Sequence, residues 1–224
     1  MSGESLEAAL ARAGSPVELL RNAKALPYTF PVAPEFSNWR SEQRAWRDAC
    51  ALLDQSHHMC DLFVRGPDAL RLFGDLGVNN VSRFHPEMAK QFVAVNHDGY
   101  LIGDGILFHL GPDDLDFVGA HPAIVDWVHF NAETGGYRVE IERNENSLDR
   151  DGPPALYRYE LQGPTAGAIV ERATGRPAPE VAFFHMTRLP IAGHEVRALR
   201  PPPLPELAQG LAGEDRGQRR GDPP

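Results

Sequence analysis

Residues 53–69 read LDQSHHMCDLFVRGPDA, and this stretch joins three predicted elements. A helix rich in Trp and Arg is predicted over 39–53, with its apolar residues roughly on one stripe. A short apolar strand follows over 62–64, and Gly66-Pro67 begins a second helix. Polar side chains capable of acid–base chemistry, those of residues 54–58, therefore lie between packed elements. We take this junction as the candidate site.

The composition is that of a globular protein, with 42% hydrophobic and 24% charged residues in a chain of 224. A net charge of −9 argues against nucleic acid as a partner, because such binding needs a basic face. The N-terminus lacks a signal-peptide pattern, and no apolar run approaches a membrane span. Cys50 and Cys60 fit two buried, reduced thiols. We expect a cytoplasmic protein that binds neither nucleic acid nor membrane.

The sequence contains an internal echo. LFVRGPDA at 62–69 matches YELQGPTA at 159–166, and each copy predicts a strand, a Gly-Pro pair and a helix. The separation of about 97 residues is too long for a solenoid repeat. We therefore predict an α+β fold made of two related halves, about 1–145 and 155–199, each an antiparallel sheet with helices on one face, the second of them incomplete.

The remaining pattern supplies the other elements. Gly103 and Gly105 interrupt one predicted strand and indicate a bulge or a close approach by another group. The Pro-, Gly- and Arg-rich residues 200–224 are predicted to be a disordered tail. NHDG at 96–99 predicts a hairpin turn. Helices are predicted over 4–13, 17–23, 68–76 and 121–134, and strands over 91–95, 100–110, 116–118, 137–142, 188–189 and 195–199.

Together these motifs resemble the glycine-cleavage T-protein superfamily, and within it the tetrahydrofolate-dependent aromatic O-demethylases of the vanillate and syringate type. The resemblance covers roughly residues 15–200. It rests on LDQSHHM (53–59), VRGPDA (64–69), GYLIGDG (99–105) and LQGP (161–164), with APEFSNWR (33–40) and TGGY (134–137) closest to the demethylases.

The resemblance implies transfer of a methyl group from a methoxylated aromatic substrate to tetrahydrofolate. Gln55 and His58 would be the substrate-side pair, since an amide can orient a phenol and a histidine can supply a proton to the leaving oxygen. Asp104 lies where the family keeps acidic residues near folate and would be catalytic or folate-facing. Tyr28 and Phe30, in the aromatic loop 27–36, and Ala120 would contact the substrate.

Two departures from the family accompany these assignments. Vanillate-type enzymes carry an arginine where this chain has Ala120, which cannot pair with a carboxylate, and a tyrosine where it has Phe30. Family members are also longer, and this chain leaves their pattern at about Arg200. We expect a truncated N-terminal part of such a protein, and a reading-frame shift near Arg200 would produce such a tail.

Structural roles stay open for each candidate. His57 and His58 are neighbours, so in an extended segment one can face the site while the other packs, and either can be a structural histidine. Asp104 can be a turn or bulge residue. The spacing of His57, His58 and Asp61 does not converge on a metal, and we predict none. The alternative functions are an inactive remnant or folate-binding module of the same family, and aminomethyl transfer in glycine cleavage.

Overall fold

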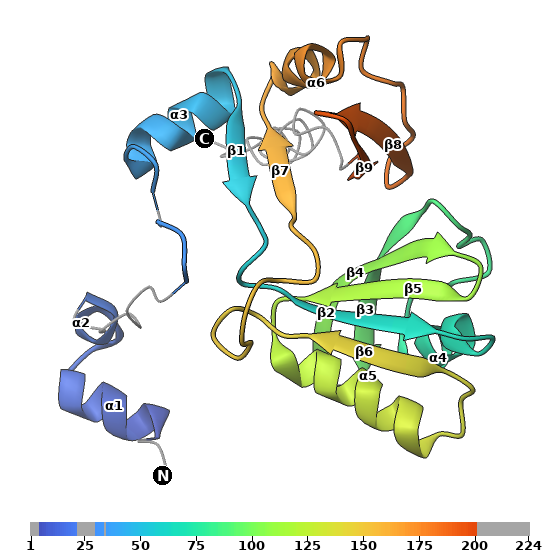
Figure 1. Cartoon of the computed structure of the whole chain (residues 1–224). Helices are drawn as coiled ribbons and strands as arrows, with labels where there is room; N and C mark the ends of the chain where they lie inside the picture. The colour runs from blue at the N-terminus through green and yellow to red at the C-terminus, as the bar shows by residue number, and fades with distance from the viewer. Residues whose placement is uncertain (1–4, 22–29, 34, 201–224) are drawn as a thin grey trace, which may run out of the picture.

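The computed structural model describes residues 5–21, 30–33 and 35–200 (Figure 1). Tyr28 and the predicted tail beyond Arg200 lie outside them. No helix within these ranges is long and apolar enough to cross a bilayer. The helices are α1 (Leu6–Ala13), α2 (Pro16–Arg21), α3 (Trp39–Asp48), α4 (Ala69–Leu76), α5 (Pro122–Thr134) and α6 (Ala166–Thr174). The strands are β1 (Ala51–Asp54), β2 (Cys60–Arg65), β3 (Ala89–Val95), β4 (Leu101–Gly111), β5 (Asp114–Gly119), β6 (Glu140–Asn144), β7 (Tyr159–Gln162), β8 (Met186–Ile191) and β9 (His194–Leu199).

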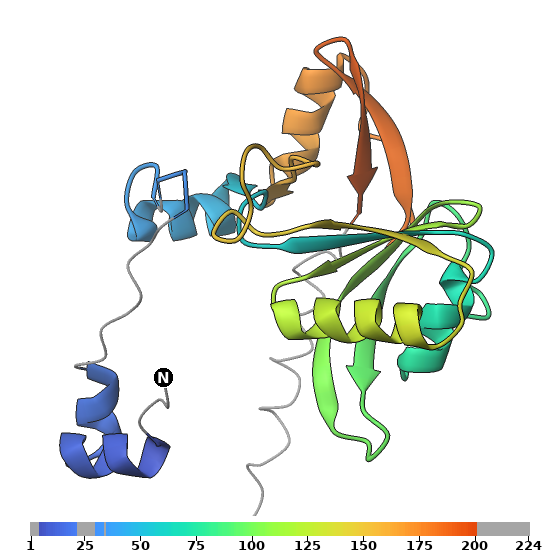
Figure 2. The ribbon, with the colours of Figure 1, turned by 60° about the horizontal axis from the view of Figure 1, so that its bottom comes forward.

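The main body is a five-stranded antiparallel sheet in the order β3-β4-β5-β2-β6, covered on one face by α4 and α5 (Figure 2). Alternate residues of its strands point to this face and meet the apolar sides of the two helices. Three phenylalanine rings lie at the centre of the resulting core, with centroids 5.1–5.9 Å apart. They are Phe73, Phe92 and Phe117.

The second part has two short sheets, β1–β7 and β8–β9, together with α3 and α6. The chain crosses between the two parts twice, at residues 55–59 from β1 into β2 and at residues 145–158 from β6 into β7 (Figure 1). At each crossing the chain leaves one sheet and enters the other. As a result β1 pairs with β7 in the second part, whereas β2 pairs with β6 in the main sheet. This α+β arrangement of helices and antiparallel sheets is the predicted fold class.

The repeated Gly-Pro motif has the same backbone conformation at both of its positions. Gly66 has φ +136° and Gly163 has φ +140°, in a region that is open almost only to glycine. A side-chain carbon at either position would overlap a backbone carbonyl oxygen, that of Arg138 for Gly66 and that of Ala49 for Gly163. Each glycine therefore lets the partner strand approach closely just before the helix begins.

The offset of 97 residues persists beyond the glycines. It relates the starts of two helices, Ala69 and Ala166, and the starts of two strands, Ala89 and Met186. It also relates two residues with positive φ that are not glycine: Glu87 at +65° and Phe184 at +54°. The two halves therefore share one backbone plan, although where the chain divides between them stays a prediction.

Several element boundaries differ from the sequence prediction, and the structure explains two of these differences. The helix predicted over 39–53 ends at Asp48, and residues 51–54 form β1 because β7, distant in sequence, supplies a strand partner. The strand predicted over 137–142 begins only at Glu140. Arg138 does not join the strand, because its backbone N–H and its guanidinium both donate to the Asp68 carboxylate, at 2.9 and 3.0 Å.

Other local predictions are confirmed. Asp68 precedes α4, and the 96–99 turn has Gly99 at φ +83°, with Asn96 N–H donating to the Tyr100 carbonyl. At Gly103 and Gly105 the predicted close approach is confirmed. The predicted interruption of the strand is wrong, since β4 runs through both residues. A side-chain carbon on Gly105 would overlap the Val118 carbonyl oxygen.

The close approach at Gly163 makes a stability prediction. Gly163→Ala should lower the free energy of unfolding by about 1–3 kcal/mol, because alanine must adopt a strained φ against the Ala49 carbonyl. Urea denaturation measures the change. Gly167→Ala is the matched control, because the added methyl group meets no heavy atom within 4 Å and the residue is helical. It should raise stability by about 0.5–1 kcal/mol, and equal effects of the two substitutions would contradict the structure.

Candidate functional site

The junction at residues 55–59 is fixed by backbone bonds to the second crossing. Ser56 is buried, and its hydroxyl accepts from the Arg158 N–H at 2.9 Å and donates to the Arg158 carbonyl at 3.2 Å. The Gln55 N–H donates to the same carbonyl at 2.8 Å. A segment without regular structure thus has little freedom, which suits side chains that must keep one orientation.

The two adjacent histidines have different surroundings. His57 Nδ1 lies 2.8 Å from the Ser147 hydroxyl, and Nε2 lies 3.7 Å from the Asp54 carboxylate. The His57 carbonyl also accepts from the Ser147 N–H at 2.8 Å. Both ring nitrogens of His57 therefore face structural partners.

His58 has no hydrogen bond from its ring among the described residues, and it packs edge-on against Phe30 with centroids 6.4 Å apart. Burial lowers the pKa of His58, although Asp54 acts in the opposite direction. The imidazole is therefore neutral near pH 7, with one N–H to donate and one nitrogen to accept. This is the ring that can serve a bound molecule.

The other predicted site residues lie around the same end of the five-stranded sheet. Gln55 donates from its amide nitrogen to the Glu160 carboxylate at 3.2 Å. Ala120 is exposed and directly follows Gly119, whose strand partners are Cys60 and Gly105.

Asp104 directly precedes Gly105 in β4. Because β5 lies between β4 and β2, Asp104 is two strand spacings, roughly 10 Å, from β2. Its exposed carboxylate accepts from the Gln91 side-chain amide at 2.6 Å through one of its two oxygens. The structure thus brings Gln55, His58 and Phe30 to one junction and leaves Asp104 at the same sheet end but apart from them.

A buried charge cluster behind the junction was not predicted. The Arg158 guanidinium lies 2.9 Å from the Asp61 carboxylate and 3.1 Å from the Asp116 carboxylate. Asn144 donates its amide to Asp61 at 2.8 Å. The arginine also lies over the Phe108 ring. The sequence did hold a signal, namely aspartates Asp61 and Asp116 between apolar residues of the strands CDLFVR and DLDFVG.

One positive charge in this cluster faces two buried carboxylates. Burial, and then the neighbouring Asp61 charge, raise the pKa of Asp116 to about 8. The Asp116 carboxyl group is therefore protonated at neutral pH, which lowers the negative charge of the cluster. Because Arg158 also holds Ser56 and Gln55 through its backbone, the cluster positions the candidate site without touching it.

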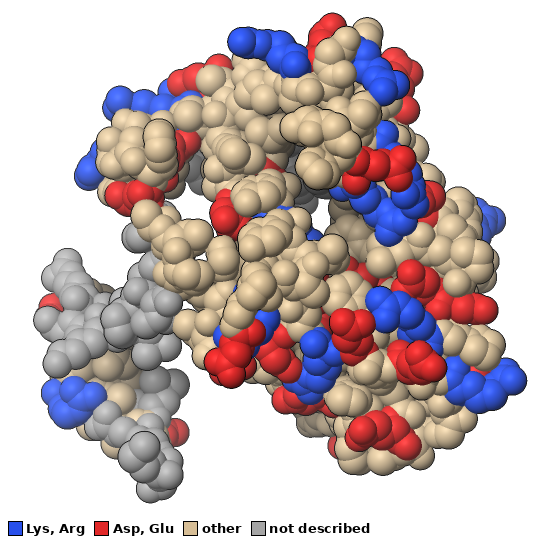
Figure 3. Space-filling model, in the orientation of Figure 1, with Lys and Arg blue, Asp and Glu red and all other residues tan. Residues whose placement is uncertain are grey.

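A metal centre is not indicated by the part of the chain that the structure describes, where no group of three or more His, Cys, Asp or Glu side chains converges. Acidic and basic side chains are interspersed over the face shown in Figure 3. The chemistry available here is proton donation and hydrogen bonding by His58 and Gln55, next to the aromatic ring of Phe30.

Comparison with known proteins agrees with the motif resemblance. The sequence profile of the GCVT N-terminal domain matches residues 18–201. A syringate O-demethylase of Sphingobium sp. is 44% identical over 213 residues, which are 94% of this chain and 44% of the relative. An aminomethyltransferase of Herpetosiphon aurantiacus is 29% identical over 154 residues, 68% of this chain and 40% of the relative.

Among solved structures, the glycine cleavage system aminomethyltransferase T from Bartonella henselae has a similar fold, with a TM-score of 0.52 at 22% identity. The match covers 80% of this chain and 48% of that one. The chain therefore spans less than half the length of each of these three relatives.

The Asp116 environment makes a pH prediction. The folded chain holds this proton up to about pH 8, whereas an unfolded aspartate releases it near its ordinary pKa of 3.8. The contribution to stability is complete below that ordinary pKa and is lost as the pH rises towards 8. Asp116→Asn keeps the shape and cannot ionise, so its free energy of unfolding should fall less between pH 5 and pH 8.

Urea denaturation at several pH values measures both slopes. The control is Asp98→Asn in the exposed 96–99 turn, which should keep the slope of the parent chain. If the Asp116→Asn variant loses as much stability as the parent over this range, the assignment of the buried proton is wrong.

Proposed function

The chain belongs to the GCVT N-terminal domain family, and on that premise we propose that it forms the substrate side of a tetrahydrofolate-dependent methyl transfer. The proposed reaction is O-demethylation of a methoxylated aromatic compound. The 44% identity to a syringate O-demethylase favours this reaction over aminomethyl transfer, because the aminomethyltransferase relative above is only 29% identical.

The observation that carries the proposal is the state of His58. A half-buried, neutral imidazole without a hydrogen-bond partner among the described residues lies against an aromatic ring, on a segment held by backbone bonds. Structural histidines such as His57 are instead satisfied by neighbours. An imidazole free to bond, beside an apolar ring, suits an aromatic ether oxygen that must gain a proton.

The chemical need follows from the leaving group. An aryl ether loses its methyl group with difficulty, because phenolate is a poor leaving group until it is protonated or hydrogen-bonded. In the proposed step the methyl–oxygen bond breaks, and the neutral His58 ring donates a hydrogen bond from its N–H to the phenolic oxygen, which carries the developing negative charge. Gln55 orients the same oxygen through its amide. Tetrahydrofolate, when bound, would supply the nucleophilic nitrogen for the methyl carbon. The proton lost from that nitrogen would pass to the phenolate, so charge and protons balance.

Asp104 fits the cofactor chemically. Its carboxylate is exposed at the site end of the sheet and uses one oxygen for Gln91, which leaves acceptor capacity for N–H groups of a pterin ring. Phe30 and Ala120 offer the substrate apolar surface and no charge. We therefore propose a substrate held by its ring and its methoxy oxygen rather than through a carboxylate at position 120.

Calorimetric titration with tetrahydrofolate tests the proposal, followed by addition of syringate and assay for 5-methyl-tetrahydrofolate. Binding with product formation supports the demethylase, and binding without turnover supports the alternative of a folate-binding module. A dissociation constant of about 1 mM corresponds to a binding free energy near −4 kcal/mol. If tetrahydrofolate does not bind at about this concentration, the proposal is wrong for this chain.

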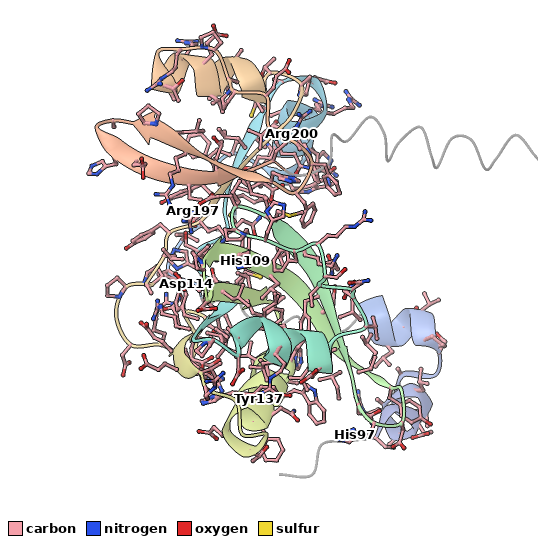
Figure 4. The ribbon with its side chains drawn as sticks, turned by 90° about the vertical axis from the view of Figure 1, so that its right-hand side faces the viewer. His97, His109, Asp114, Tyr137, Arg197 and Arg200 are labelled. Atoms are coloured by element: carbon pink, nitrogen blue, oxygen red, sulfur yellow. The ribbon has the colours of Figure 1, made fainter. Side chains whose placement is uncertain are left out.

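If the chain turns over, His58→Ala should lower the rate roughly 10²-fold or more, the usual loss when acid–base help is removed. His194→Ala is the control, because His194 is exposed on the β8–β9 hairpin, at the far end of the main sheet from the junction and from the 96–99 turn that carries His97 (Figure 4). An unchanged rate for His58→Ala, with a fold that remains intact, would remove His58 from the mechanism.

A further inference from the structure

Two histidines from distant parts of the chain meet where the β8–β9 hairpin joins the main sheet. The ring centroids of His85 and His185 lie 6.2 Å apart, with the ring planes at 64°. His85 is exposed and His185 is half-buried. Both residues shortly precede strands, β3 and β8, at the end of the main sheet that lies away from the junction at residues 55–59.

The two histidines belong to tight turns that are equivalent in the two halves. The Met88 N–H donates to the His85 carbonyl at 3.2 Å, and the His185 N–H donates to the Ala182 carbonyl at 3.0 Å. The two turns differ by the offset of 97 residues, so His85 is the first residue of one turn and His185 is the last residue of the other. The repeated backbone plan therefore brings the two side chains together.

Backbone bonds hold the two turns against each other. The Ala89 N–H donates to the Phe184 carbonyl at 2.7 Å, and the Met186 N–H donates to the Glu87 carbonyl at 2.8 Å, which makes a symmetric pair. Figure 4 shows the contact between the hairpin and the main sheet from the side, with Arg197 labelled on the hairpin. The backbone segments that carry the two imidazoles therefore have a fixed separation.

The hydrogen bonds of the two rings determine which nitrogen carries the proton. Nδ1 of His185 lies 2.8 Å from the Phe183 carbonyl oxygen, and Nδ1 of His85 lies 3.1 Å from the Pro86 carbonyl oxygen. Because a carbonyl oxygen only accepts, Nδ1 is the protonated nitrogen of each neutral ring, and Nε2 has the lone pair. Neither Nε2 atom has a hydrogen-bond partner among the described residues.

This arrangement is typical of histidines that bind metal ions. Such residues commonly donate the N–H of their other ring nitrogen to a backbone carbonyl, which orients the ring. Since a zinc–nitrogen bond is about 2.0–2.1 Å long, two imidazoles on one ion have their ring centres roughly 5–6.5 Å apart. The separation of 6.2 Å between His85 and His185 lies within this range.

We propose that His85 and His185 bind one divalent transition-metal ion of the Zn²⁺ or Ni²⁺ class through their Nε2 atoms. Imidazole nitrogen suits these ions. The remaining coordination positions are taken by water, for which the exposed His85 leaves room. Because the site has two protein ligands, it is not one of the groups of three or more, which the described part of the chain lacks. The bound ion joins the main sheet to the hairpin.

Calorimetric titration of the full chain with Zn²⁺, in a buffer that does not bind metal, tests the site. His85→Ala and His185→Ala should each weaken binding at least tenfold, because even the loss of a residue that only supports a ligand costs about 10–100-fold. The double variant should lose little more than either single variant, since one imidazole alone holds the ion weakly. His194→Ala is the matched control, because it removes an exposed histidine from the turn end of the same hairpin and should leave the affinity unchanged.

Hydrogen exchange shows whether the ion joins the two halves. The bonds donated by the Ala89 and Met186 amides break when the hairpin leaves the sheet. Zn²⁺ at about ten times its dissociation constant should therefore slow exchange at both amides about tenfold, because it binds only the closed arrangement. The Gly99 amide, in the exposed 96–99 turn, is the internal reference and should not change.

Three results would overturn the proposal. They are the absence of Zn²⁺ and Ni²⁺ binding, an affinity of the double variant equal to that of the parent, which would show an adventitious ion only, and binding without slower exchange at Ala89 and Met186. Near-ultraviolet circular dichroism checks the fold of each variant. His85→Gln and His185→Gln, which keep a hydrogen-bonding side chain, replace any alanine variant that is unfolded. None of these readouts needs folate, so the outcome is independent of the proposed function.

Discussion

The ion pairs of the partly buried Arg158 guanidinium are the interaction on which the junction depends. The guanidinium lies between two carboxylates from neighbouring strands of the main sheet, while the arginine's own backbone bonds to Ser56 and Gln55. A single buried charge would be very unfavourable, and two carboxylates without the arginine would repel each other. The two crossings between sheets therefore remain side by side because charge balance requires it. The histidine segment inherits its position from this arrangement.

The residues of the Arg158 cluster have a structural role, whereas His58 is placed to bind another molecule. Asp61 and Asp116 are buried, and each accepts one hydrogen bond within the cluster, Asp61 from Asn144 and Asp116 from Arg158. His58 has the opposite properties: it is partly exposed, and its ring has no hydrogen bond among the described residues. A rigid buried support next to such a side chain keeps a binding residue in one orientation before a ligand arrives.

Predictions from sequence succeeded where short-range rules decide the structure. The Gly-Pro helix starts, the 96–99 turn and the position of α4 follow from residues close to one another in the chain. The helix predicted over 39–53 was too long because Leu52 and Leu53 pair with β7, and no local pattern shows a partner that distant. In the site, Gln55 and His58 were proposed from their motif, while Arg158, in the second crossing, and Glu160, in β7, were missed because they are distant in sequence. Their roles in catalysis stay predictions.

The exchange of strands between the two halves has a consequence for how the chain is made. β1 is synthesised first, but Ser56, just beyond it, is separated from its bonding partner Arg158 by 102 residues. During translation β1 therefore stays unpaired until the whole first sheet and its helices have been synthesised. Closing so long a loop is slow unless intervening structure has already brought its ends together. The first half thus acts as a template that places the second crossing, and β7 beyond it, next to β1.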